Sequence, residues 1–123
     1  MMAEQIPPQV QNQLVRFQEL QEQLKAIIMR KQQFVLETKE VDKALTESKN
    51  LADDAVIYKS VGVLLFRTEK AKIVAELTER KEEFDLRIKT IDKQEQRLKL
   101  QLEELRKTIM DQVNLSSKGS ISG

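Results

Sequence analysis

At 123 residues, with 33% charged and 40% hydrophobic side chains, the chain has the length of one domain and the composition of a soluble protein. It contains no cysteine and no histidine, which excludes disulfides and thiolate metal sites and removes the commonest general base. The net charge of +1 is too small to hold a phosphate backbone. We therefore expect no enzymatic activity, no cofactor, no bound metal and no nucleic-acid partner.

The remaining composition favours long helices over a globular core. Four Phe, one Tyr and no Trp cannot fill a bulky interior, whereas Gln, Glu, Lys and Leu are abundant. The first residues, MMAEQIPPQVQNQL, lack a basic region followed by an apolar run, and no segment approaches 18 apolar residues. We expect a cytoplasmic protein with neither a signal peptide nor a membrane span.

A first helix is predicted from about residue 10 to residue 50. Residues spaced alternately three and four apart form a seam, and eight of its twelve members are apolar. A seam sustained over more than five heptads is typical of a coiled coil. Its positions are Val10, Gln13, Phe17, Leu20, Leu24, Ile27, Lys31, Phe34, Thr38, Val41, Leu45 and Ser48.

The pattern changes after Asn50, where the segment ADD at 52–54 favours a helix end and a turn. Asp53 and Asp54 are interpreted as turn residues rather than a metal site, because no other acidic or carbonyl ligands stand at loop spacing. The following segment, AVIYKSVGVLLFRT at 55–68, is the only run of β-branched and aromatic residues. It predicts a β-hairpin.

The turn of this hairpin is expected near Val61 and Gly62. Alternation places Ile57, Lys59 and Val61 on one face of the first strand and Val56, Tyr58 and Ser60 on the other. In the second strand, Leu64 and Phe66 alternate with Val63, Leu65 and Arg67.

Such a hairpin is marginal in water by itself, because both edges and an apolar face would be exposed. No comparable run occurs elsewhere in the sequence, so the missing strands should come from other subunits. The predicted assembly residues are Val56, Ile57, Tyr58, Val61, Gly62, Val63, Leu64, Leu65 and Phe66.

A second helix is predicted from about residue 69 to residue 113, with Thr68 as its N-cap and Glu69 in its first turn. Its seam has nine apolar members among twelve. These positions are Val74, Leu77, Lys81, Phe84, Ile88, Ile91, Glu95, Leu98, Leu102, Leu105, Ile109 and Gln112. Residues 1–114 are expected to form one domain, and the Ser- and Gly-containing segment 115–123 a flexible tail.

The two seams match in length, and the intervening residues can reverse the chain, which predicts an antiparallel two-helix coiled coil. The alternative, a parallel homodimer of one continuous helix, is disfavoured by Gly62 and the β-branched segment. Lys31, Lys81 and Glu95 interrupt the seams. We interpret them as setting the register, since a two-helix seam offers no dry pocket for a catalytic lysine.

This order of elements, with IPPQVQNQL at the start, resembles the beta-type subunit of prefoldin, and the archaeal form in particular, from about Ile6 to Val113. The most specific matching residues are Pro7, Pro8, Gln9, Val56, Tyr58, Lys59, Val61 and Gly62. The resemblance implies one β-hairpin per chain, against two in alpha-type subunits.

The resemblance further implies a hexamer of two alpha and four beta subunits. Its hairpins would join as intersubunit β-barrels that form a platform, from which the coiled coils extend. Proteins of this family are chaperones that hold unfolded polypeptides between the coiled-coil ends and pass them to a group II chaperonin without ATP.

In an antiparallel hairpin both chain ends meet, so client binding is expected near residues 6–17 and 105–115. The candidate residues are Ile6, Val10, Leu14, Phe17, Leu105, Ile109, Met110 and Val113, with Leu115 beside them. Leu14 and Met110 lie off the seam, and an unbranched Met adapts to many shapes.

Two alternatives remain open. Val10, Phe17, Leu105 and Ile109 could only close the end of the coiled coil. The whole chain could also be a coiled-coil adaptor or tether with defined partners, whose ends are closed.

Overall fold

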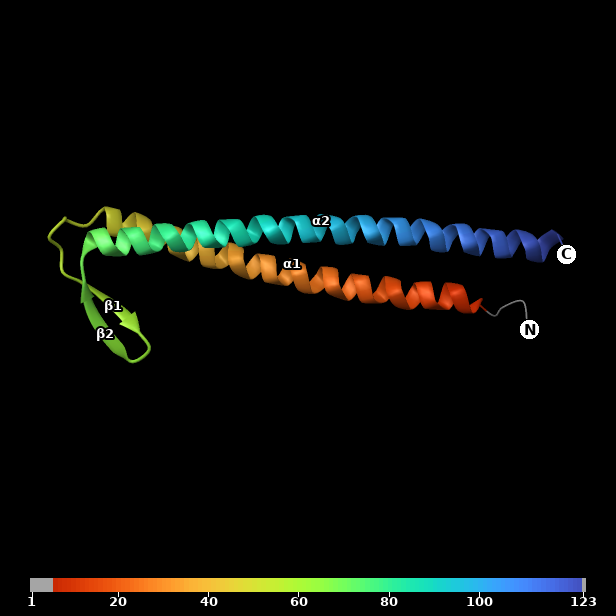
Figure 1. Cartoon of the computed structure of the whole chain (residues 1–123), viewed down its shortest axis with the longest axis horizontal. Helices are drawn as coiled ribbons and strands as arrows, with labels where there is room; N and C mark the ends of the chain where they lie inside the picture. The colour runs from red at the N-terminus through yellow and green to blue at the C-terminus, as the bar shows by residue number, and fades with distance from the viewer. Residues whose placement is uncertain (1–5, 123) are drawn as a thin grey trace. The chain divides into compact units, whose positions relative to one another are not determined.

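The computed structural model of the chain describes residues 6–122, and the side chains of residues 6–115. Two long helices are separated in the sequence by two strands, as Figure 1 shows. The elements are α1 (Pro8–Lys49), β1 (Ile57–Val61), β2 (Leu64–Thr68) and α2 (Lys70–Ser122). The predicted fold class, mainly α with one β-hairpin between two coiled-coil helices, is confirmed.

The chain divides into two compact units. The terminal unit contains residues 6–29 and 92–122 of the described chain, and the hairpin unit contains residues 30–91. Because α1 and α2 each contribute to both, every unit contains one segment of each helix.

The seam residues form the core of each unit. Every predicted seam position is buried or half-buried. The most buried are Val10, Leu20 and Leu98 in the terminal unit, and Val41, Leu45, Ser48 and Ile91 in the hairpin unit. Each Å² of apolar surface removed from water contributes about 25 cal/mol, so burial of these side chains stabilises the helix pairs.

Within the hairpin unit the two helices pack in opposite directions. The ring centroids of Phe34 and Phe84 are 5.9 Å apart. Further along α1, Asp42 Oδ1 lies 2.8 Å from Nζ of Lys81, which is an earlier residue of α2. The seam prediction of an antiparallel pair therefore holds in this unit.

Lys81 illustrates how a charged residue is tolerated in the seam. Its half-exposed ammonium forms an ion pair with Asp42 across the helix pair. The hydrogen bond from Lys81 and the negative charge of Asp42 raise the pKa of this lysine. The long aliphatic stem covers part of the seam while the charged end stays in water.

The first helix begins at a proline, a residue suited to the first helical position because its missing N–H needs no partner there. Pro8 is this residue, and the carbonyl oxygen of Pro7 accepts the first helical hydrogen bond from Gln11 N at 3.0 Å. Gln11 Nε2 also donates to the carbonyl oxygen of Ile6 at 2.9 Å. The start of α1 is thus fixed locally.

Two predictions at the ends of α2 differ from the structure. Thr68, the expected N-cap, is the last residue of β2 and pairs with Ile57, because the β-ladder holds its backbone extended. The carbonyl oxygen of Glu69 instead accepts the first helical bond, from Ile73 N at 3.1 Å. The helix continues to Ser122, beyond the expected end near 113. Flexibility of the 115–123 segment stays a prediction.

The two strands form an antiparallel hairpin, as predicted, and its two-residue turn lies one residue after the expected position near Val61 and Gly62. Val61 pairs with Leu64, which leaves Gly62 and Val63 at the turn. Among the described residues Gly62 alone has a positive φ, of 60°. A glycine of positive φ at the first turn position, followed by a residue of negative φ, is the pattern of a type II′ turn. This turn matches the right-handed twist of the strands.

Candidate assembly and client-binding surfaces

The register divides the hairpin into two faces, because directly paired residues lie on the same side of a sheet and neighbours along a strand alternate. The first face, called here the apolar face, carries Ile57, Lys59, Val61, Leu64, Phe66 and Thr68. The second, called the mixed face, carries Tyr58, Ser60, Leu65 and Arg67. Both faces follow the predicted alternation.

Most of the predicted assembly residues are exposed. Ile57 is half-buried and Gly62 lies at the open turn. The exposed apolar members are Val56, Tyr58, Val61, Val63, Leu64, Leu65 and Phe66. Since β1 and β2 make the only sheet found in residues 6–122, each strand also keeps one unpaired edge. An exposed apolar strand with an open edge is a pairing surface for another chain.

One ion pair connects the hairpin to α2. Lys59 Nζ lies 2.8 Å from Glu76 Oε2, and both side chains are partly exposed. Between β1 and α2 there is an open groove of about 460 Å³, whose lining includes Glu79, Arg80 and Glu83 in addition to this pair. The one charged side chain of the apolar face therefore finds its counter-charge within the same chain.

The connector before β1 is held by Lys70, at the start of α2. Its Nζ donates to the carbonyl oxygen of Leu51 at 2.7 Å and to Asp53 Oδ1 at 3.3 Å. Ala55 N donates to the carbonyl oxygen of Ala52 at 3.1 Å, which closes a turn around Asp53 and Asp54. Both aspartates are turn residues, as the sequence indicated.

All eight predicted client-binding residues fall in the terminal unit, in two different environments. Val10 is only 3% exposed, and three further members, Phe17, Leu105 and Ile109, are half-buried at seam positions. The exposed members are Ile6, Leu14, Met110 and Val113, together with Leu115. The unit therefore combines a covered seam with off-seam apolar side chains in water.

Gln13 and Gln112 are two of the polar residues at seam positions of the terminal unit. The Oε1 atoms of Gln13 and Gln112 are buried, with no hydrogen-bond partner among the described residues. An unsatisfied buried carbonyl oxygen costs about 1–3 kcal/mol. The two helices are consequently held together less strongly at these positions than they would be by a pair of leucines.

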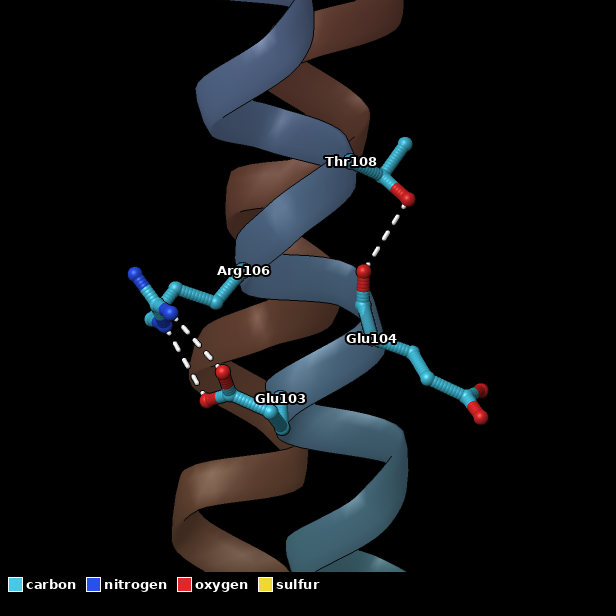
Figure 2. Close-up of polar contacts among 4 residues, drawn as sticks. All are labelled: Glu103, Glu104, Arg106 and Thr108. Atoms are coloured by element: carbon cyan, nitrogen blue, oxygen red, sulfur yellow. Dashed lines mark hydrogen bonds and ion pairs between the residues drawn. The ribbon is translucent and has the colours of Figure 1, made fainter.

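One ion pair of α2 in the terminal unit forms within the helix itself. Figure 2 shows Arg106 donating to both carboxylate oxygens of Glu103, from Nε at 3.1 Å and from Nη2 at 2.8 Å. The bond and charge of Arg106 lower the pKa of Glu103. On another side of the helix, Thr108 Oγ1 donates to the carbonyl oxygen of Glu104 at 3.0 Å.

Five further exposed apolar residues, one of them within residues 6–17, were not among the predicted off-seam positions. They are Val15, Met29, Leu36, Leu86 and Leu100. Seam positions are alternately three and four residues apart. Each exposed residue of this set lies two positions after the second member of a seam pair that is three apart. It therefore stands on the side of its helix turned away from the seam. Counting off-seam apolar residues along the whole sequence would have found them.

Two kinds of feature, a membrane-spanning helix and a metal-binding cluster, are absent from the described residues. Over residues 6–122, neither helix has a stretch long and apolar enough to cross a membrane. Within the same range, no three acidic side chains are grouped so that they could hold a metal ion.

Two long helices joined through one β-hairpin define a coiled-coil hairpin protein, and comparison with known proteins identifies the family. Residues 11–115 match the family described as "Prefoldin subunit", and the chain belongs to this family. It is a family of chaperone subunits and not a known enzyme family.

The relatives that the chain resembles are archaeal beta subunits, as the sequence predicted. It is 44% identical to "Prefoldin subunit beta" of Methanothrix thermoacetophila over 104 residues, which cover 85% of this chain and 87% of the relative. It is 47% identical to the protein of the same name from Pyrobaculum neutrophilum over 105 residues, covering 85% and 83%.

A solved structure supports the same assignment. The prefoldin beta subunit from Thermococcus strain KS-1 superposes with a TM-score of 0.82 at 42% identity, over 88% of this chain and 95% of that one. Sequence and fold therefore both place the chain among prefoldin chaperone subunits of the beta type.

Proposed function

We propose that this chaperone subunit assembles through its β-hairpin with alpha subunits and further beta subunits, as a hexamer of two alpha and four beta chains. In that assembly the terminal unit binds unfolded polypeptides, which are then delivered to a group II chaperonin without ATP. The proposal rests on the family and on the apolar residues that the terminal unit exposes.

The observation that carries client binding is the exposure of off-seam apolar side chains near both chain ends. Leu14 is 37% exposed and Met110 is 50% exposed. Neither is needed for the seam, so each is free to cover apolar surface of an unfolded chain. Burial of that surface contributes about 25 cal/mol per Å². The flexible thioether of Met110 adapts to clients of different shape.

The weak seam near the chain ends supports an adaptable grip. Gln13 and Gln112 replace apolar pairs there, so partial separation of the helices costs less than it would at a leucine pair. Separation would expose Val10 and Ile109 as additional contacts. Each contact is weak, and several subunits acting together raise the overall affinity while every contact stays reversible.

The experiment compares two double variants of the assembled complex. Leu14→Ser with Met110→Ser removes the off-seam apolar residues of the terminal unit. Leu36→Ser with Leu86→Ser is the matched control, since these residues are 60% and 66% exposed in the hairpin unit. Suppression of aggregation of several unrelated unfolded clients is measured by light scattering, after native mass spectrometry has verified equal assembly.

We expect the first variant to need about tenfold more complex for the same suppression, corresponding to about 1.4 kcal/mol of lost binding. The control variant should behave as the parent. Equal activity of both variants would contradict client binding at Leu14 and Met110 and would favour an adaptor with closed ends. Delivery is tested separately, by transfer of a fluorescent client to an added group II chaperonin in the absence of ATP.

A further inference from the structure

The sulfur chemistry of this chain is confined to methionine, because the sequence has four Met and no Cys. Met29 and Met110 belong to the described residues, and Met1 and Met2 lie outside them. Met29 is 61% exposed and Met110 is 50% exposed, so both side chains are open to a small oxidant. Oxidation of a thioether to the sulfoxide converts an apolar side chain into a polar one.

Met110 forms part of an apolar patch on α2. Residues three positions apart are neighbours on the surface of a helix, and Val113, three residues later, is also exposed. Arg106, four residues before Met110, donates to Glu103 at 2.8 Å, as Figure 2 shows. The patch is therefore bounded on that side by an ion pair, and its apolar character depends on Met110.

A change at Met110 should alter this surface without disturbing the helix pair. The adjacent Ile109 is half-buried at a seam position, whereas Met110 lies off the seam. A sulfoxide oxygen on an exposed side chain stays hydrated in the free protein. An apolar client segment that covered the side chain would have to remove this water without replacing its hydrogen bonds, which is unfavourable.

From this placement we infer that Met110 is a site of reversible oxidation that weakens client binding. The thioether sulfur attacks one oxygen of hydrogen peroxide, and the O–O bond breaks as the S–O bond forms. The departing hydroxide takes the proton of the sulfur-bound OH and leaves as water, so sulfur is oxidised and peroxide is reduced. Sulfoxide reductases reverse the change, with a thiol as reductant. The inference rests on the proposed client binding by the terminal unit and adds regulation to it.

Met29 provides the matched control, because it is at least as exposed as Met110 and lies outside the proposed client-binding residues. The parent chain, Met29→Leu and Met110→Leu are each treated with hydrogen peroxide, cleared of it with catalase, and then assembled with an untreated prefoldin alpha subunit. Peptide mapping by mass spectrometry measures the sulfoxide at each methionine, and native mass spectrometry verifies assembly. Suppression of client aggregation is compared with that of the same protein before treatment.

We expect the oxidised parent and the oxidised Met29→Leu protein each to need about threefold more complex for the same suppression. Met110→Leu should need no more complex after treatment than before it, whatever its starting activity. Methionine sulfoxide reductases for both sulfoxide epimers, supplied with dithiothreitol, should return the parent to its untreated activity.

Three results would overturn the inference. They are an equal loss in all three proteins, full activity of a parent whose Met110 is completely converted to the sulfoxide, and oxidation of Met29 without oxidation of Met110. Each would leave client binding by the terminal unit intact. Failure of the proposed client binding is recognised separately, because Leu14→Ser with Met110→Ser would then keep the parental activity without any oxidant.

Discussion

The terminal unit and the hairpin unit both cover their helical seams, yet they differ in where uncovered apolar residues are concentrated. In the hairpin unit, β1 and β2 expose a paired cluster at Val61 and Leu64. In the terminal unit, exposed apolar residues such as Leu14 and Met110 stand on helices whose backbone bonds are already made. Open edges favour permanent pairing with strands, whereas isolated side chains on helices favour weak, reversible contacts.

The largest effect expected from one substitution is at the seam. Leu45→Ala removes a side chain that is almost completely buried in the hairpin unit. It should lower the free energy of unfolding by about 2–5 kcal/mol, the usual cost of a leucine-sized cavity. Urea unfolding followed by circular dichroism measures it. The matched control is Leu36→Ala on the exposed side of α1, for which a change below about 0.5 kcal/mol is expected.

The next largest effect is expected from a substitution that changes the hairpin and leaves the helical seam intact. Gly62 has φ of 60°, and an added Cβ would meet no atom within 4 Å. The cost of Gly62→Ala is therefore backbone strain alone, about 1–2 kcal/mol. Association with an alpha subunit should weaken by about fivefold or more, while helix unfolding stays at the parental value. The control Leu36→Ala, on the exposed side of α1 and outside the hairpin, should leave association at the parental value.

A smaller effect is expected where the connector is fastened to α2. Lys70→Met keeps most of the aliphatic stem but removes the hydrogen bonds to Leu51 O and Asp53 Oδ1. Loss of these bonds should cost about 1 kcal/mol and speed amide exchange in the connector at 50–56. Hydrogen exchange with mass spectrometry measures it, with Lys72→Met as the control. Unchanged exchange in the Lys70 variant would show that this contact does not order the connector.

The smallest effect concerns pH in the terminal unit. Because Arg106 lowers the pKa of Glu103, the ion pair supports α2 above the ordinary glutamate pKa and is lost as the pH falls through the lowered value. An NMR titration should place the Glu103 midpoint below that of a free glutamate. Arg106→Gln should return it to the ordinary range, and Lys99→Gln, on another ion pair, should not. The effect on stability is small since both groups are exposed.

The sequence predicted the helical seams well because periodic burial leaves a direct pattern. Alternating spacings of three and four placed Val41 and Ile91 in covered positions, and both are buried. The hairpin was predicted equally well. The β-branched residues around Gly62 favour strands over a helix, and the glycine favours a turn. The two faces followed from alternation alone, whereas the turn lies one residue after the expected Val61 and Gly62, and the pairing register was not predicted.

Contacts that depend on side-chain reach could not be read from the spacing. The bonds of Lys70 to the connector and of Lys59 to Glu76 join residues 17 to 19 positions apart, at distances set by the fold. The boundary at Thr68 was misplaced because a threonine suits both a strand end and a helix cap. The ladder to Ile57 decided between the two.

The most direct test of the central claim is hydrogen exchange at residues 57–68, measured in the chain alone at low concentration and in its complex with an alpha subunit. A hairpin completed by other subunits should exchange rapidly in the single chain and at least about tenfold more slowly in the complex, while the seam around Val41 is protected in both. Equal exchange of the hairpin in the two samples would contradict completion of this sheet by neighbouring subunits.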